Sequence, residues 1–221
     1  MIPKILHYIW LGGEKPQSIQ SYISTFPKHF SGYKIIEWNE SNIDISNYDP
    51  ELKALWETSY RNKKFAFCSD ISRMYILLEN GGIYVDTDEE FLKPIPDEFL
   101  KKPFLCRNNP TQEVCNGCVW GCCKGDTLAS ACIRWFSKHL QENKSTYGKG
   151  WIFNKILNSY FVSFGYDQEN TETQDVVDYR IYATEYFCPM SLMTKRLYLT
   201  DNSIAIHHYE KSWKQASKGC V

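Results

Sequence analysis

The stretch that decides the fold is GGIYVDTD, at residues 81–88. Its two glycines end the helical pattern before it, since glycine readily adopts the backbone conformations that close a helix. The apolar run at residues 83–85 predicts a short buried strand that stops at Asp86 and Asp88. In open α/β sheets, ligands bind beyond the carboxyl ends of the strands, so this stretch predicts an α/β fold with a polar site at a strand end.

The segments upstream of this stretch fit the same architecture. Residues 65–80 carry apolar side chains at helical spacing and predict a helix that ends at the glycine pair. Before it, residues 5–11 and 33–38 predict strands, and residues 17–30 predict a helix between them. A strand, a helix and a second strand in this order open an α/β unit with parallel strands.

The rest of the chain continues the alternation of elements. Further helices are predicted at residues 50–61, 127–143 and 151–161, strands at 104–106, 118–121, 181–184 and 203–208, and an exposed loop at 165–178. We therefore expect one domain over residues 1–221, with a mainly parallel central sheet flanked by helices.

Composition narrows the class of protein. The 221 residues carry 25 Lys and Arg against 26 Asp and Glu, a formal net charge of −1, which argues against a basic nucleic-acid module. Aromatic residues make up 15%, which fits both a carbohydrate- or nucleotide-binding protein and a bulky core. No apolar stretch is long enough to span a membrane, and no secretory leader is recognised, so we expect a cytoplasmic protein with reduced thiols.

Asp86 and Asp88 are the first candidate functional residues. Two carboxylates this close repel one another, and the pair is stabilised by a bound cation or a proton. Oxygen ligands with open coordination positions suit Mg²⁺ or Mn²⁺, which also bind a diphosphate. The alternative is a solvated turn that binds nothing.

Four segments together resemble the DXD sugar transferases of glycosyltransferase family 32, which include capsule and lipo-oligosaccharide transferases and yeast initiating mannosyltransferases. They are also similar to the catalytic domains of the large clostridial glucosylating toxins. The four segments are IPKILHYIWLGG at 2–13, AFCSDISR at 66–73, GGIYVDTD at 81–88 and HHYEKSW at 207–213.

The resemblance implies a GT-A fold and a retaining transferase that uses Mn²⁺ or Mg²⁺. The donor would be a UDP- or GDP-linked sugar and the acceptor a glycan or lipid-linked glycan, in surface polysaccharide synthesis at the inner face of a membrane. A carbohydrate- or nucleotide-binding protein that kept the fold and lost transfer is the alternative. The resemblance leaves the donor sugar, the linkage and the oligomeric state open.

The resemblance also implies a role for individual residues. The Ile9 backbone and Trp10 would hold the base, Tyr84 would lie against the nucleotide, and Trp213 would cover the diphosphate or donor sugar. The implied catalytic residues are Asp70, Arg73, Asp86 and Asp88; the implied metal ligands are Asp86, Asp88 and His207 or His208; the implied nucleotide-sugar contacts are Ile9, Trp10, Ser69, Tyr84, Asn116 and Trp213.

Several of these roles have simpler alternatives. Asp70 and Arg73 could form an ordinary helical ion pair, and Trp10 or Tyr84 could pack in the core. Adjacent histidines on a strand face opposite ways, so one of the two would bind metal, and a regular strand favours His208.

Two further segments depart from simple expectations. Residues 149–151 lie where the family has a Gly-Pro loop, but proline is absent. Four cysteines at 115, 118, 122 and 123 raise the possibility of a zinc or iron–sulfur site. Their spacing does not give two separated ligand pairs, so buried thiols packed in a sheet are the preferred interpretation.

Overall fold

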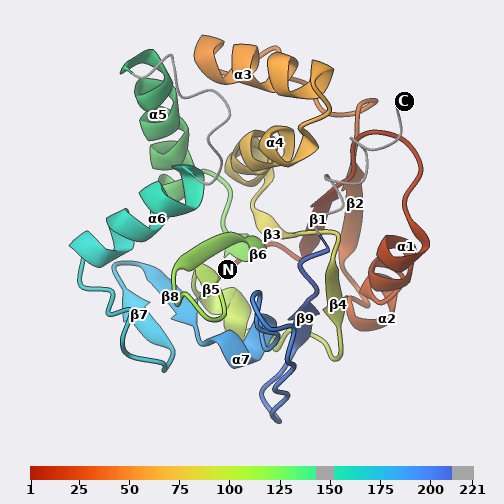
Figure 1. Ribbon diagram of the computed structural model, residues 1–221, viewed down its shortest axis with the longest axis vertical. Helices are drawn as coiled ribbons and strands as arrows, with labels where there is room; N and C mark the ends of the chain where they lie inside the picture. The colour runs from red at the N-terminus through yellow and green to blue at the C-terminus, as the bar shows by residue number, and fades with distance from the viewer. Residues whose placement is uncertain (143–151, 211–221) are drawn as a thin grey trace.

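The computed structural model describes residues 1–142 and 152–210 (Figure 1). A central sheet of seven strands runs through the molecule in the spatial order β2-β1-β3-β6-β5-β8-β7. The strands are β1 (Ile5–Ile9), β2 (Lys34–Trp38), β3 (Gly82–Val85), β5 (Phe104–Arg107), β6 (Val114–Cys122), β7 (Gln174–Val176) and β8 (Tyr179–Tyr182). A separate two-stranded ribbon pairs β4 (Glu89–Phe91) with β9 (Ala205–His207).

The strand directions confirm the expected α/β sheet. β1 pairs in parallel with β2 and β3, and β5 pairs in parallel with β8. β6 lies antiparallel between β3 and β5, and β7 is antiparallel to β8. Five of the seven strands therefore share one direction, and their carboxyl ends lie at one edge of the sheet.

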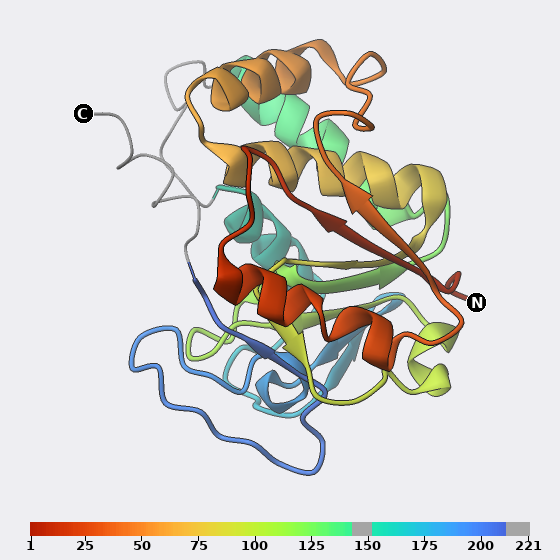
Figure 2. The ribbon, with the colours of Figure 1, turned by 90° about the vertical axis from the view of Figure 1, so that its right-hand side faces the viewer.

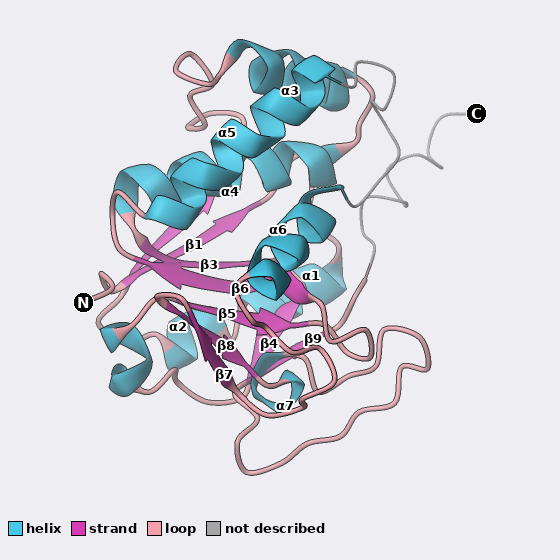
Figure 3. Cartoon of the chain, turned by 90° about the vertical axis from the view of Figure 1, so that its left-hand side faces the viewer, coloured by secondary structure: helices cyan, strands magenta, loops and turns pink. Residues whose placement is uncertain are grey.

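Helices and the small ribbon cover the two faces of the sheet (Figures 2 and 3). On one face lie α3 (Pro50–Arg61), α4 (Phe65–Asn80), α5 (Thr127–Glu142) and α6 (Ile152–Ser163). On the other face lie α1 (Gln17–Ile23), α2 (Phe26–His29), the short 3-10 helix η1 (Asp97–Lys101), α7 (Thr184–Phe187) and the β4–β9 ribbon. Each face has its own cluster of buried apolar side chains.

The helix α4 packs on the central sheet and bears two of the candidate site residues, Asp70 and Arg73. Its apolar side chains Ile71, Met74 and Leu77 are buried against the sheet. The helix closes at Gly81, whose φ of 64° lies in the left-handed region that favours glycine. The next residue, Gly82, has a φ of 101°, and a side chain there would collide with the carbonyl of Ile5 on β1. The glycine pair thus lets α4 pass directly into β3.

The structure differs from the sequence-based expectation at several elements. The helix expected at 17–30 is two helices, α1 and α2, separated at residues 24–25. Pro27 lies in the first turn of α2, where its lack of a backbone N–H is tolerated, whereas it would break a continuous helix. The expected loop at 165–178 contains β7. The strand expected at 203–208 exists as β9, but it pairs with β4 outside the central sheet. No described helix is both long and apolar enough to cross a membrane.

Candidate active site

The centre of the site is a buried arginine shared by two carboxylates. Arg73 Nη2 lies 3.1 Å from Asp70 Oδ1, one helical turn away, and 3.2 Å from Asp86 Oδ1 just beyond β3. The Arg73 side chain is only 5% exposed, whereas those of Asp70 and Asp86 are 31% and 27% exposed. Asp70 and Arg73 do form the helical ion pair, but the pair is also joined to the acidic residue beyond β3.

Burial and charge together set the protonation of these carboxyls. Burial is the main cause that raises the pKa of Asp70 to about 6; the cation of Arg73 opposes it and the charge of Asp86 adds to it. Burial also raises the pKa of Asp86. The cation of Arg73 opposes this shift, and the negative charge of Asp88 adds to it. The site therefore holds more acidic charge than Arg73 alone balances, which favours binding of a further cation.

Tyr84, the buried tyrosine of β3, contacts both Asp86 and Arg73. Its side chain is 1% exposed, its hydroxyl donates to Asp86 Oδ1 at 2.8 Å, and the guanidinium of Arg73 lies 4.5 Å from its ring centroid. This buried position does not support the expected contact between Tyr84 and a nucleotide. Tyr84 instead orients Asp86 and gives Arg73 a ring to stack on.

Asp88 lies next to His207 from the neighbouring ribbon. Asp88 Oδ1 is 3.3 Å from His207 Nε2, and Asp88 Oδ2 accepts the backbone N–H of Glu210 at 2.9 Å. Although burial opposes ionisation, His207 and this N–H hold the pKa of Asp88 at about 2. Burial likewise opposes the charged form of His207, but Asp88 and Glu89 raise its pKa to about 10.

The geometry favours His207 over His208 as the histidine of the site. His208 Nε2 lies 2.8 Å from Glu90 Oε2, and its ring stacks on that of Tyr22 with centroids 4.1 Å apart. The preference for His208 rested on a regular strand, but β9 ends at His207. His207 therefore keeps the strand orientation that brings it to Asp88.

The oxygen and nitrogen atoms fit a divalent cation. Asp86, Asp88 and His207 each offer a ligand atom, and these atoms lie within 4.8 Å of one another. Carboxylate oxygens suit Mg²⁺ or Mn²⁺. Because Asp86 and Asp88 are partly exposed, an ion bound to them would keep open coordination positions for a phosphate.

Other expected site residues lie near the same edge of the sheet. Ile9 is the last residue of β1 and is buried, and Trp10 follows it, partly exposed, with its indole N–H donating to the Gly13 carbonyl at 2.7 Å. Trp10 is therefore held outside the core, where a base could stack on it. Ser69 is partly exposed on α4, beside Asp70.

Asn116 is on β6, directly before Gly117, which contacts Asp86. Its side chain is 2% exposed, and its amide nitrogen is buried without a hydrogen-bond partner. The adjacent Gly117 carbonyl accepts the backbone N–H of Asp86 at 3.0 Å. Trp213 and residues 149–151 lie outside the described residues.

Sequence reasoning missed Gly117, although it is close to the acidic centre. A Cβ at this position would lie 2.5 Å from Asp86 Oδ2 and 3.2 Å from Arg73 Nη1. The absence of a side chain is therefore what lets β6 approach the ion pair. The signal in the sequence was a glycine inside an otherwise apolar strand.

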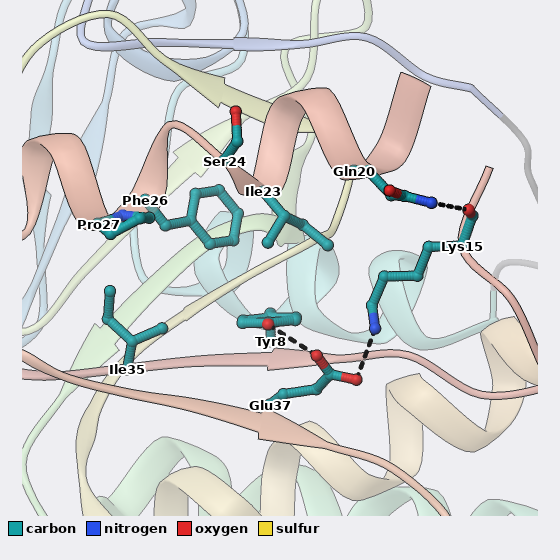
Figure 4. A pocket seen from close by; sticks show the side chains of 9 residues that line it. All are labelled: Tyr8, Lys15, Gln20, Ile23, Ser24, Phe26, Pro27, Ile35 and Glu37. Carbon is teal, nitrogen blue, oxygen red and sulfur yellow. Dashed lines mark hydrogen bonds and ion pairs between the residues drawn. The ribbon is translucent and has the colours of Figure 1, made fainter. Parts of the chain in front are cut away.

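A pocket of 450 Å³ lies elsewhere, between α1, α2 and the β1–β2 pair (Figure 4). Within it the Tyr8 hydroxyl donates to Glu37, and Lys15 pairs with Glu37 at 2.7 Å. The lining includes none of the acidic residues that follow β3, so this pocket is not the candidate active site.

Comparison with known families agrees with the site. Residues 16–105 match the model of the glycosyltransferase sugar-binding region containing the DXD motif. This match includes α4, β3 and the residues that follow β3, and therefore Asp70, Arg73, Asp86 and Asp88 of the acidic cluster.

Curated relatives match part of the chain. An uncharacterized glycosyltransferase of Acanthamoeba polyphaga mimivirus is 32% identical over 44% of this chain and 39% of its own length. Subversion of eukaryotic traffic protein A of Legionella pneumophila is 28% identical over 58% of this chain and 24% of its own length. Inositol phosphoceramide mannosyltransferase 1 of Schizosaccharomyces pombe is 24% identical over 47% and 33%. The chain thus spans less than two-fifths of each of these relatives.

Solved structures show the same fold at low sequence identity. PaToxG glycosyltransferase matches with a TM-score of 0.55 and 18% identity, over 74% of this chain and 72% of that one. A glycosyltransferase involved in glycosylation of the major capsid of PBCV-1 matches with a TM-score of 0.51 and 11% identity, over 98% of both chains. The fold is that of the GT-A glycosyltransferases, and residues 16–105 are similar to the DXD-containing sugar-binding region of glycosyltransferases.

Proposed function

We propose that this protein is a glycosyltransferase, a metal-dependent enzyme that moves a sugar from a nucleoside diphosphate donor to an acceptor hydroxyl. The observation that carries the proposal is the pair Asp86 and Asp88, held at the open edge of the sheet by Arg73 on one side and His207 on the other. Two partly exposed carboxylates held this close repel one another, so a cluster that served only stability would not be expected to contain both.

Asp86 and Asp88 are the residues that would hold the cation. When bound, a divalent ion neutralises charge that develops on the departing diphosphate, which lowers the barrier by several kcal/mol. Arg73 and Tyr84 fix the orientation of Asp86, and the Glu210 N–H and His207 fix that of Asp88. Asp70, 31% exposed beside Arg73, is placed to accept hydrogen bonds from the hydroxyls of a ribose or a donor sugar.

We further propose that transfer retains the anomeric configuration. The acceptor oxygen would bond to the anomeric carbon on the face from which the diphosphate leaves, the bond to the diphosphate would break, and the acceptor proton would pass to a diphosphate oxygen. Asp70 and Asp86 are engaged by Arg73, and Asp88 by His207, so this cluster offers no uncommitted carboxylate as a nucleophile.

The donor and acceptor classes follow from the resemblance. We propose a UDP- or GDP-linked hexose as donor and a glycan or lipid-linked glycan as acceptor, in surface polysaccharide synthesis at the cytoplasmic face of a membrane. The name of the fission yeast relative, a mannosyltransferase with a lipid substrate, supports including GDP-mannose among the donors to be tested.

A screen of nucleotide sugars tests the proposal. The purified chain is incubated with UDP- and GDP-sugars and Mn²⁺, and release of the free nucleotide is measured with and without a chelator. We expect slow hydrolysis of one donor that the chelator stops. Calorimetry with UDP and GDP runs in parallel and should show tighter binding with Mn²⁺. Metal-enhanced binding without hydrolysis or transfer would favour the non-catalytic alternative, and absence of both would overturn the proposal.

A further inference from the structure

A second group of metal-binding side chains lies behind the acidic pair, inside the protein. Glu89 on β4, Cys118 on β6, Cys188 after α7 and His207 on β9 are all buried, and each offers a ligand atom within 4.8 Å of the others. The four positions are distant in sequence: two lie on the β4–β9 ribbon, one lies in the central sheet and one lies just after α7. This arrangement explains why the cysteine spacing at 115–123 alone did not indicate a metal site.

Glu89 is the member that the fold leaves without explanation. Its side chain is 1% exposed, and neither carboxylate oxygen has a hydrogen-bond partner. An ionised carboxylate removed from water costs several kcal/mol unless a partner compensates it. The nearest group of opposite sign is His207, whose Nδ1 lies 3.9 Å from Glu89 Oε1, too far for a hydrogen bond.

The backbone places Glu89 and His207 against each other. In the antiparallel β4–β9 ribbon they are direct partners in register, so their side chains project from the same face. That face looks towards the central sheet, where Cys118 Sγ lies 2.9 Å from His207 Nδ1 and 2.9 Å from Cys188 Sγ. Thiols, imidazole and carboxylate therefore converge on one point between the ribbon and the sheet.

The set of four donor side chains fits a tetrahedral ion better than a disulfide. A Zn²⁺ ion with bonds of about 2.0–2.3 Å to its ligands separates neighbouring ligand atoms by roughly 3.3–3.8 Å. All four ligand atoms lie within 4.8 Å of one another, and the 3.9 Å between Glu89 Oε1 and His207 Nδ1 is close to this range. The two sulfurs, 2.9 Å apart, would separate by roughly 1 Å to bind the ion. A disulfide bond is about 2.05 Å long, and it would leave Glu89 unpaired.

We propose that Glu89, Cys118, Cys188 and His207 Nδ1 bind a structural Zn²⁺ ion. Two thiolates and an imidazole select zinc over Mg²⁺ or Mn²⁺, which prefer oxygen ligands, and the ion supplies the positive charge that the buried Glu89 needs. The ion fastens the β4–β9 ribbon and the end of α7 to the central sheet.

The zinc site also gives His207 a defined role at the acidic pair. A histidine that binds metal through one nitrogen usually donates its other N–H to a carboxylate, and Nε2 of His207 faces Asp88 Oδ1 at 3.3 Å. His207 is then a positioning residue that orients Asp88, and the Mg²⁺ or Mn²⁺ at the DXD pair is held by carboxylates. Only this last role rests on the proposed function; the zinc site does not.

Metal analysis of the intact chain tests the zinc site without reference to transfer. The protein is expressed with added zinc, dialysed, and its metals are measured by mass spectrometry. We expect about one Zn²⁺ per chain in the wild type, and less than about 0.2 in Cys118→Ala and Cys188→Ala. Cys132→Ala removes an equally buried thiol on α5 and is the control, which should keep its zinc.

Cobalt substitution identifies the ligands even if a variant folds poorly. Wild-type protein loaded with Co²⁺ should show the intense visible bands of a tetrahedral site and a thiolate-to-metal charge-transfer band, and Glu89→Gln should shift the visible bands. Alkylation under non-reducing conditions with mass spectrometry checks the competing chemistry. A metal-free wild type with reactive thiols, or a Cys118–Cys188 disulfide, would overturn the proposal, whatever the outcome of the donor screen.

Discussion

Arg73 and Asp86 are joined by an ion pair of 3.2 Å between Nη2 and Oδ1, and the arginine is the more deeply buried partner, at 5% against 27% exposure. The guanidinium of Arg73 is buried on α4, and the more exposed carboxylate of Asp86 lies just beyond β3. Arg73 therefore holds Asp86 by charge and geometry from behind, leaving the outer side of Asp86 for a ligand. The helix α4 and the strand β3 are coupled through this contact.

Arg73→Gln should destabilise the protein strongly. The change leaves Asp70 and Asp86 without their shared cation, and removal of one partner from a buried ion pair costs about 3–5 kcal/mol. Urea denaturation measures the free energy of unfolding, with the exposed Arg134→Gln on α5 as the control that should change it by less than about 0.5 kcal/mol.

A double-mutant cycle distinguishes the ion pair from simple packing. Adding Asp86→Asn to Arg73→Gln should cost much less than the two single changes together, because the second carboxylate charge is then no longer uncompensated. Additive losses would show that Arg73 acts through its packing on Tyr84 instead.

Asp88→Asn should abolish metal-dependent turnover while the fold remains. Loss of one anionic oxygen ligand weakens the cation site, and we expect a loss of donor hydrolysis of at least about 100-fold. The matched control is Glu90→Gln, two residues along β4, which pairs with His208 and not with the acidic centre. Circular dichroism establishes that both variants fold, and near-normal hydrolysis by Asp88→Asn in Mn²⁺ would contradict the assignment.

His208→Gln tests the choice between the adjacent histidines. His208 stacks on Tyr22 and pairs with Glu90, so we expect Mn²⁺-dependent binding of UDP or GDP to change by less than about threefold, an energy of ~0.6 kcal/mol. Calorimetry makes the measurement. A loss of metal-dependent binding as large as that of Asp88→Asn would return the metal role to His208.

Gly117→Ala should damage the site through the backbone of β6. The added methyl group would lie 2.5 Å from Asp86 Oδ2, so the carboxylate or the strand must shift. We expect a loss of about 1–3 kcal/mol in unfolding free energy together with weaker Mn²⁺-dependent nucleotide binding. Gly121→Ala, at the far end of the same strand against the Phe104 ring, should lower stability but leave binding by the folded protein unchanged.

The sequence predicted the parts of the fold that depend on local pattern. The helix at 65–80, its glycine stop and the strand before Asp86 follow from periodicity and from two residues that tolerate positive φ. The acidic cluster could be anticipated because β3 runs back along α4, so that Asp86 after the strand meets Arg73 near the middle of the helix. The family resemblance added the His207 segment, which local pattern alone could not attach to Asp88.

The remainder depends on contacts between distant segments. Cys118 and Cys188 meet because β6 lies in the central sheet and α7 packs against it, a relationship that no spacing between cysteines encodes. Similarly, Tyr84 could be assigned to either face of its strand, and only the packing of α4 places it beneath Arg73. The position of His208 depended on where a short strand ends, which is the least predictable property of such an element.

His7 should make the stability of the fold depend on pH. Its ring is fully buried, its Nε2 lies 2.8 Å from the Gly81 carbonyl, and its Nδ1 accepts the Trp38 indole N–H at 3.0 Å. Burial lowers the pKa of His7 to about 4, and a protonated Nδ1 would lose the bond from Trp38. The unfolded chain binds this proton below about pH 6.5 and the folded chain only below about pH 4, so protonation favours unfolding between these values.

The contribution of His7 is therefore complete above pH 6.5 and is lost as pH falls towards 4, up to about 3 kcal/mol in total. Urea denaturation at pH 7 and pH 5 measures it, and the wild type should lose about 2 kcal/mol more than His7→Gln over this interval, because glutamine can bond to Gly81 but does not titrate. His29→Gln, on α2 away from this contact, should behave like the wild type. Equal losses in the wild type and His7→Gln would show that other groups cause the pH dependence.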